Sequence, residues 1–371
     1  MRKTLLVLLF LFMLSPPAFS APGAVRCGKL LDVRSGQMLG DQLVVFDASG
    51  TVTSVSSFSS TKLPNGVTAI DLSNATCLPG LIDVHTHAGD VEGPRMRVSG
   101  PALGITGGHC DNNLLPSEFH YKSDGVADGP WAARAKVREV VKYGADVIKI
   151  CASGGVLSKG DQPGTPQFTL EEMQAIAEEA HKLGRKVAAH AHGTQSIKDA
   201  IRAGIDSIEH SSLIDDEGIM LAKQHGTYLV FDIYNDDYIH QEGAKAGMLP
   251  ESIEKEKKIG RLQRENFRHA YQSGAKLAFG TDSGVYPHGD NAKQFGKMVE
   301  WGMKPLEAIQ AATVNAADLL GWADKIGALE TGHYADLIAV SGDPASDVHV
   351  LESVKFVMKG GAVVRNDLAA K

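Results

Sequence analysis

Residues 186–210 read KVAAHAHGTQSIKDAIRAGIDSIEH, and this stretch contains the pattern that decides the fold. Its two ends, 186–190 and 206–210, are short strand-like runs that each finish in a histidine. A strand, an amphipathic helical segment and a second strand form the unit from which parallel sheets are built. The stretch therefore predicts neighbouring parallel strands with a histidine at the carboxyl end of each.

The same alternation of strands and helices extends over residues 79–327. Further strand-like runs lie at 146–151, 227–232 and 276–280. Thr169 and Glu172 form a capping box that opens a helix ending at Lys182. This alternation predicts an α/β fold of the (β/α)8 barrel type.

Both ends of the chain differ from this middle region. Residues 24–71 and 335–364 hold short β-type runs separated by turn residues, without a long helix. Two β-rich ends predict one small β-sandwich assembled from both termini. We therefore expect a composite β domain over 21–78 and 328–371, around a barrel over 79–327.

The first 20 residues are expected to be a signal peptide outside the fold. Arg2 and Lys3 precede an apolar run over 5–14, and the small residues Ala18 and Ser20 suit a signal peptidase. The run is well short of the roughly twenty residues that span a bilayer, which disfavours an uncleaved anchor. We expect cleavage after Ser20 and an exported protein, periplasmic or secreted, with no membrane attachment afterwards.

The composition is that of a folded protein that acts on small molecules. The 371 residues include 43% hydrophobic residues, which argues against disorder, and carry a formal net charge of -7. An acidic chain is a poor partner for nucleic acid, because phosphate binding needs a basic face. A small molecule or dipeptide is the expected ligand, and a homo-oligomer stays open.

Cysteine spacing gives no sign of a metal knuckle or a disulfide framework, although export would permit disulfides. The chain has four cysteines: Cys27, Cys77, Cys110 and Cys151. We expect all four to be small buried apolar residues. A disulfide between Cys27 and Cys77 is the alternative, because both fall in the expected β domain.

Residues 79–87 read PGLIDVHTH and end an apolar run with His85 and His87. Side chains at i and i+2 of a strand share one face, here the barrel interior. An isolated pair would more often begin a loop, but four later strands also end in potential metal ligands: Lys149, His190, His210 and Asp282. Side chains at the carboxyl ends of barrel strands converge on one mouth, where the active site lies.

This order of ligands along the chain resembles the amidohydrolase superfamily of metal-dependent hydrolases. The segment 327–338, GALETGHYADLI, is similar to the re-entry into that superfamily's β domain, so the resemblance covers nearly the whole mature chain. Four motifs look like the Xaa-Pro dipeptidase and imidazolonepropionase-like group: 107–111, 148–155, 190–193 and 286–291. The nearest similarity is to its metallo-carboxypeptidases, including ochratoxin-degrading amidohydrolases.

The resemblance implies two divalent metal ions held by six ligands: His85, His87, Lys149, His190, His210 and Asp282. The first two histidines bind one ion, the last two bind the other, and Lys149 bridges them as a carbamate formed with carbon dioxide. A lysine desolvated among apolar neighbours titrates low enough for this reaction, whereas the alternative is an ordinary buried ion pair. Nitrogen and oxygen ligands without thiolate suit zinc first.

A two-metal site of this kind activates water at neutral pH. Asp282 is expected to act as general base and then as general acid. Tyr234, just after the run 227–232, is our candidate for a hydrogen-bond donor to the carbonyl. In the family interpretation three further histidines line the pocket or orient ligands: His109, His192 and His288. Glu209 precedes a ligand on an alternating strand and is expected to face away from the mouth.

The first hypothesis is a binuclear-metal amidohydrolase that cleaves the bond to a C-terminal amino acid, as a metallo-carboxypeptidase or dipeptidase acting on N-acyl or ochratoxin-type substrates. Its rival is a cyclic-amide hydrolase of the imidazolonepropionase kind. A third hypothesis is a protein that binds metal without turnover. Every ligand position holds a residue that can bind a metal, which argues against the third hypothesis.

One spacing departs from a complete barrel. Lys149 follows His87 by 62 positions, whereas three βα units would need about 93. A strand over 95–99 and a helix over 131–143 are the regular elements expected in this segment. We therefore predict a barrel one βα unit short, with seven strands and a gap beside the first strand, following a deletion around 88–93. Such a chain would be less stable and less active than an intact relative, or catalytically impaired.

Overall fold

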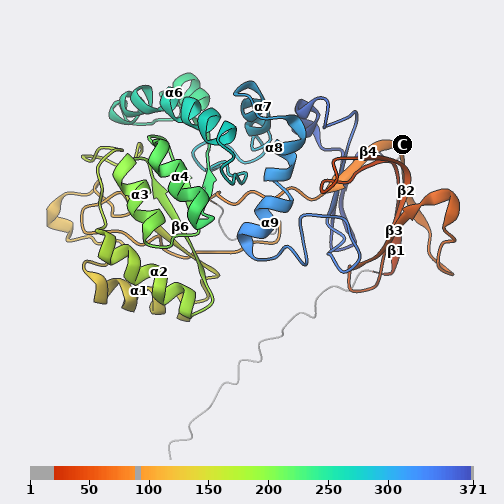
Figure 1. Ribbon diagram of the computed structural model, residues 1–371, viewed down its shortest axis with the longest axis horizontal. Helices are drawn as coiled ribbons and strands as arrows, with labels where there is room; N and C mark the ends of the chain where they lie inside the picture. The colour runs from red at the N-terminus through yellow and green to blue at the C-terminus, as the bar shows by residue number, and fades with distance from the viewer. Residues whose placement is uncertain (1–20, 88–92, 369–371) are drawn as a thin grey trace, which may run out of the picture.

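The computed structural model describes residues 21–87 and 93–368 (Figure 1). The expected signal peptide lies outside the described residues, as does most of the segment in which the deletion is predicted. Helices and a small parallel sheet gather in one part of the molecule, and a separate mixed β-sheet forms the other, at the right of Figure 1. No helix in the described ranges is long and apolar enough to cross a membrane.

The mixed sheet joins strands from both ends of the chain. Its strands are β1 (Gly23–Leu31), β2 (Met38–Phe46), β3 (Val52–Ser57), β4 (Ala69–Pro79), β9 (Leu337–Val340), β10 (Phe356–Lys359) and β11 (Ala362–Asn366). They form one sheet in the order β11-β10-β9-β4-β1-β2-β3. The expected β-sandwich is therefore wrong in its layering. The long strand β4 pairs with β1 on one side and with β9 on the other, and so makes a single sheet of the two terminal segments.

The parallel sheet holds four strands in sequence order: β5 (Val147–Cys151), β6 (Lys186–Ala191), β7 (Ser207–His210) and β8 (Tyr228–Val230). The helices of this part are α1 (Pro130–Lys142), α2 (Leu170–Lys182), α3 (Thr194–Arg202), α4 (Asp216–His225), α5 (Asn235–Glu242), α6 (Pro250–Gln272), α7 (Lys293–Glu300), α8 (Pro305–Ala311) and α9 (Val314–Leu320). Three short 3-10 helices complete the elements: η1 (Phe58–Ser60), η2 (Ser117–Phe119) and η3 (Val348–Ser353). The capping box at the start of α2 is present.

Burial explains how these strands aim their side chains. Ile148 and Ile150 of β5 are both fully buried in the main apolar core. Because successive strand residues point to opposite faces, Lys149 between them points away from that layer. In the parallel register Lys149 pairs with Ala188, and His190 pairs with Glu209, so Lys149, His190 and Glu209 share this inner side of the sheet.

Three more segments extend the sheet through single parallel bridges only: Thr86 with Ser283, Leu103 with Ile150, and Leu229 with Leu277. The expected strand at 276–280 is thus reduced to one bridge. The expected strand at 95–99 is wrong, because pairing with β5 occurs at Leu103 instead. A further parallel bridge, between Gly104 and Val126, adds another segment beside the one that contains Leu103. The seven-stranded barrel therefore stays a prediction.

The predicted gap lies beside the segment 81–87. Residues 84–87 form backbone hydrogen bonds with 279–283 on one side. Within 21–87 and 93–368, no backbone hydrogen bond joins 81–87 to the segment 93–129 on the other side. The gap beside the first strand stays a prediction, because residues 88–92 lie outside the described ranges.

All four cysteines are paired, so the expectation of free buried thiols is wrong. Disulfides join Cys27 to Cys77 and Cys110 to Cys151. The parallel pairing of β1 with β4 brings Cys27 and Cys77 together. The bridge between Leu103 and Ile150 of β5 brings the segment that contains Cys110 close to Cys151. These pairings depend on contacts between distant segments, which is why local spacing did not reveal them.

Candidate metal centre

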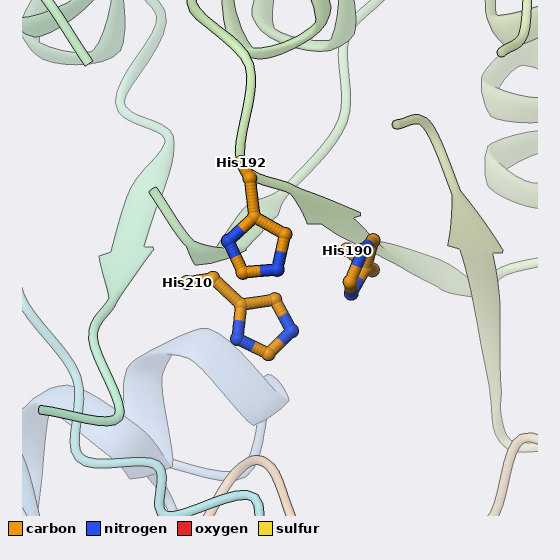
Figure 2. A group of neighbouring side chains, drawn as sticks. All are labelled: His190, His192 and His210. Carbon is orange, nitrogen blue, oxygen red and sulfur yellow. The ribbon is translucent and has the colours of Figure 1, made fainter. Parts of the chain in front are cut away.

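Three histidines from neighbouring strand ends form the first part of the site. His190 lies on β6, His192 just beyond it, and His210 at the end of β7. Their potential ligand nitrogens lie within 4.8 Å of one another. The rings of His192 and His210 stack with their centroids 4.5 Å apart. Figure 2 shows these two rings next to each other, with His190 beside them. The convergence expected of His190 and His210 is present, and His192 joins them.

A second group of ligands lies next to the first. Asp282 Oδ1 is 3.0 Å from His87 Nε2 and 3.3 Å from His85 Nε2. The ring of His85 is also 5.1 Å from that of His210, measured between centroids. His85 is buried, whereas the side chain of His87 is 68% exposed. The two groups thus meet through His85, with His87 at the open side.

Lys149 lies between the two groups. Its Nζ is 3.2 Å from His85 Nε2. Burial lowers the pKa of the Lys149 ammonium, although the carboxylates of Glu209, Asp282 and Asp232 act to raise it. The structure therefore brings together all six predicted ligand positions: His85, His87, Lys149, His190, His210 and Asp282.

The residues present fit divalent cations. Burial, followed by the positive neighbours around them, holds the pKa values of His85, His190 and His192 well below the ordinary value, so these rings are neutral. Neutral imidazoles offer lone pairs to a metal. The buried Nδ1 of His85 has no hydrogen-bond partner within the described part of the chain. Packed neutral rings beside a carboxylate and a lysine make a donor set of nitrogen and oxygen, without thiolate.

Asp232 supports His210 and was missed in the sequence. Both oxygens of its carboxylate are 3.0 Å from His210 Nδ1. Burial acts to lower the pKa of His210, but Asp232 outweighs it and the pKa is raised. A carboxylate that accepts from Nδ1 leaves Nε2 of the same ring free for a metal. The position of Asp232 at the end of the run 227–232 was the available signal.

Glu209 corrects the expected alternation on β7. It is 1% exposed, and its Oε2 lies 3.5 Å from His85 Nδ1, so it faces the site rather than away from it. The backbone of His210 and of Ser211 is left-handed, with φ of 67° and 51°. This twist ends the regular strand, so Glu209 and His210 both reach the inner side. Burial raises the pKa of Glu209.

Asp83 was also missed, and it links the His85 segment to the chain near Asp282. Its carboxylate accepts hydrogen bonds from Thr281, through both the backbone N–H and the hydroxyl, and from Asn291 Nδ2. The backbone N–H of His85 donates to the same carboxylate at 3.2 Å. Side-chain contacts therefore position this part of the site.

The remaining predicted residues lie at different distances from the cluster. The ring of His109 stacks on that of His190 at 4.1 Å, and burial lowers the pKa of His109 to about 4. His288 Nε2 is 2.7 Å from the carbonyl oxygen of His87 and so orients that residue. Tyr234 packs against Tyr286 and lines a cavity of about 460 Å³ between α7 and η3. Its role as a carbonyl donor stays a prediction.

Comparisons with known proteins show the family to which this chain belongs. The model of the amidohydrolase family matches residues 91–364. Ochratoxinase of Aspergillus niger is 37% identical over 298 residues, which cover 75% of this chain and 61% of that protein. The chain therefore belongs to the amidohydrolase family. It spans about 61% of the length of this curated relative.

Solved structures give the same fold. A Xaa-Pro dipeptidase with methionine bound in its active site has a TM-score of 0.87 and 35% identity, covering 93% of this chain and 100% of that one. A prolidase complexed with N-methylphosphonate-L-proline has a TM-score of 0.85 and 29% identity, covering 93% and 100%. The α/β part and the separate mixed sheet thus form an amidohydrolase fold like that of prolidases.

Proposed function

We propose that this chain is a binuclear-metal amidohydrolase that cleaves the amide or peptide bond to a C-terminal amino acid. The observation that carries the proposal is the meeting of six ligand residues at one mouth: His85, His87, Lys149, His190, His210 and Asp282. A donor set of imidazole nitrogen and carboxylate oxygen favours zinc. We assign Lys149 as a carbamate because its amine is desolvated and lies between the two groups of ligands.

The relatives support the substrate class. The dipeptidase structure contains methionine in its active site, and the prolidase structure contains an N-substituted proline. Both ligands are amino acids or close derivatives with a free α-carboxylate. Together with the identity to ochratoxinase, they favour a substrate whose leaving group is a free amino acid.

When bound, the two ions would polarise the substrate carbonyl and make water acidic enough to ionise at neutral pH. Asp282 would take the proton of the attacking water and pass it to the leaving amine. Its carboxylate suits this task because Oδ1 faces His85 and His87, while Oδ2 is 3.5 Å from Asn235 Nδ2. Asp232 would hold His210 in the tautomer that ligates through Nε2.

We also propose that the protein is exported. The apolar run at 5–14 with its flanking charges supports a signal peptide, and two disulfides favour an oxidising compartment. Finding the full N-terminus on the protein isolated from its native host would contradict cleavage after Ser20.

The test is a substrate panel on the purified mature chain. N-acyl-phenylalanine should release phenylalanine, and its C-terminal amide should react at least roughly tenfold more slowly if the free carboxylate is recognised. Equal rates for the acid and its amide would contradict recognition of the free carboxylate but would leave the proposed amidase activity in place. Faster ring opening of a cyclic amide would favour the alternative hydrolase, and two bound metals without turnover of either substrate would identify an impaired relative.

A further inference from the structure

The two disulfides differ in the elements that they join. Cys27–Cys77 links β1 to β4, two strands that already pair through their own backbone ladder. Cys110–Cys151 links a loop to the last residue of β5. Between residues 93 and 129, η2 is the only helix or strand. The second disulfide therefore restrains a segment that regular secondary structure does not hold.

This segment brings a histidine to the metal centre. Leu103 makes two backbone hydrogen bonds to β5, each of 2.8 Å. At the other end, Cys110 is bonded to the same strand. His109 lies directly before Cys110, and its ring stacks on that of His190. We call residues 103–110 the His109 loop, which is fixed to β5 at both of its ends.

The other contacts of His109 are non-covalent. Its backbone N–H donates to Gln167 Oε1 at 2.9 Å, and its ring Nδ1 is 2.7 Å from Ser158 Oγ. A Cβ added at Gly104 would lie 2.7 Å from Cβ of Cys110, so this glycine lets the cysteine approach β5. Opening the disulfide would release the main chain beside His109. A shift of about 1 Å at such a site is enough to slow a reaction.

The two disulfides also differ in how far a reagent can reach them. Cys27 and Cys77 are both 0% exposed, whereas Cys110 is partly exposed and Cys151 is 3% exposed. Thiol–disulfide exchange requires access to one of the sulfur atoms. A reductant can therefore open the Cys110–Cys151 bond in the folded protein and leave the other bond intact.

We propose that the Cys110–Cys151 disulfide is a redox-sensitive lock, which holds His109 against the metal centre when it is closed and lowers activity when it is open. The closing step is an exchange with an oxidant of the disulfide class, such as glutathione disulfide. Two protein thiols lose their hydrogens, the bond between Cys110 and Cys151 forms, and the oxidant leaves as two thiols.

The chain then reaches full activity only in an oxidising compartment, which fits the proposed export. The effect of the lock on turnover rests on the proposed amidase function. The state of the bond and the order of the His109 loop do not depend on that function.

Reduction of the native, metal-loaded protein is the first test. After incubation with reduced glutathione, free thiols in one sample are alkylated and located by peptide mass spectrometry, and we expect them at Cys110 and Cys151 only. In a parallel sample kcat/KM for N-acyl-phenylalanine should fall by roughly ten- to a hundredfold, and glutathione disulfide should restore it. Full activity with both thiols free would overturn the proposal. Reduction of Cys27–Cys77 alone would do the same.

Two double variants test the lock without a reductant. Cys110→Ala with Cys151→Ala should show the low kcat/KM and should no longer respond to glutathione, which excludes metal chelation as the cause. Cys27→Ala with Cys77→Ala is the matched control, because the two bonds span similar sequence separations of 41 and 50 residues. Both pairs should lower the Tm, but the control should keep its kcat/KM. Equal kinetic losses would mean that the bond acts through stability alone and would contradict the lock. If the control does not fold, the native reduction decides.

Hydrogen exchange separates the lock from the amidase. Reduction should speed amide exchange in 103–110 and leave β1 and β4 unchanged. Metal content should stay constant, because none of the six ligands lies in the His109 loop, and loss of metal on reduction would overturn the assignment to His109. If the loop loosens but no substrate of the panel is ever cleaved, the amidase fails and the lock stands.

Discussion

The two halves of the candidate metal centre are held in place by different means. The strand half consists of Lys149, His190 and His210 on β5, β6 and β7. These strands are neighbours in one continuous parallel ladder, in which Cys151 is paired with His190 and Ala191 with His210. The loop half consists of His85, His87 and Asp282, which lie outside any named strand. Backbone pairing therefore positions one half, and side chains position much of the other.

The contacts of the loop half are few and specific. The segments 84–87 and 279–283 share backbone hydrogen bonds but only a single bridge, Thr86 with Ser283, and the carboxylate of Asp83 also connects them. His87 is 68% exposed, whereas His190 is 5% exposed. The comparison shows that ligands of the same chemical kind can be held in place by contacts of unequal strength. The loop half should be the first to lose its metal and the one most improved by added structure.

The largest effect is expected at Lys149, which lies between the halves. Lys149→Ala should lose most of both metals and reduce kcat/KM by roughly a thousandfold or more, because alanine cannot supply a bridging oxygen anion. Metal content by mass spectrometry and turnover of N-acyl-phenylalanine measure this. Lys142→Ala at the end of α1 is the matched control. Full occupancy and rate in the Lys149 variant would eliminate the carbamate.

Asp282→Asn should separate the role of Asp282 as general base from its role as a metal ligand in the loop half. We expect a loss in kcat on the order of a hundredfold, because an amide cannot relay the proton, while much of the metal is retained. Metal content and kcat measured on the same sample decide the outcome. An unchanged kcat would mean that the general base is another residue.

Chelator titration should reveal the inequality of the halves directly. We expect two phases of metal release, with the faster phase arising from the loop half. His87→Ala should weaken this ion by roughly ten- to a hundredfold and leave the slower phase. His190→Ala should instead abolish the slower phase. One phase in the unmutated protein, or the same change in both variants, would remove the distinction between the halves.

The smallest effect is expected from restoring chain length. Inserting the corresponding segment of an intact relative after Ala88 should raise the Tm by a few °C and increase turnover, because it would pair the open edge beside His85. An insertion of equal length rich in glycine and serine is the control. If the relative's segment leaves Tm and turnover the same or lower, the gap is harmless and the strand count is wrong.

Much of the site could be predicted because its ligands follow strand ends. The runs before Lys149, His190 and His210 have strong local patterns, and each became a strand. The segment 276–280 has a similar composition but forms only one bridge at Leu277. Apolar composition alone does not tell how many backbone hydrogen bonds a segment makes, because its neighbours decide that.

The supports of the ligands were much harder to foresee. The carboxylate of Asp232 contacts the ring of His210, and the carboxylate of Asp83 accepts from the backbone N–H of Thr281. Both partners lie on other segments of the chain. Glu209 pairs with His190 and shares its face of the sheet, and the left-handed backbone at His210 and Ser211 lets the adjacent His210 reach the same side. A single sequence records neither a left-handed turn at a non-glycine residue nor the partner of a buried carboxylate.

The sequence by itself determined the α/β class and predicted six ligand positions, which the structure brings together. The shortage of one barrel unit stays a prediction. The class follows from local periodicity, the ligand set from the resemblance to the amidohydrolase superfamily, and the predicted shortage from counting residues between strand ends. Only the tertiary structure decided the single seven-stranded sheet, the two disulfides and the contact of Asp232 with His210. These features join segments far apart in the chain. Their geometry is fixed when the segments pack together, and local sequence patterns do not encode it.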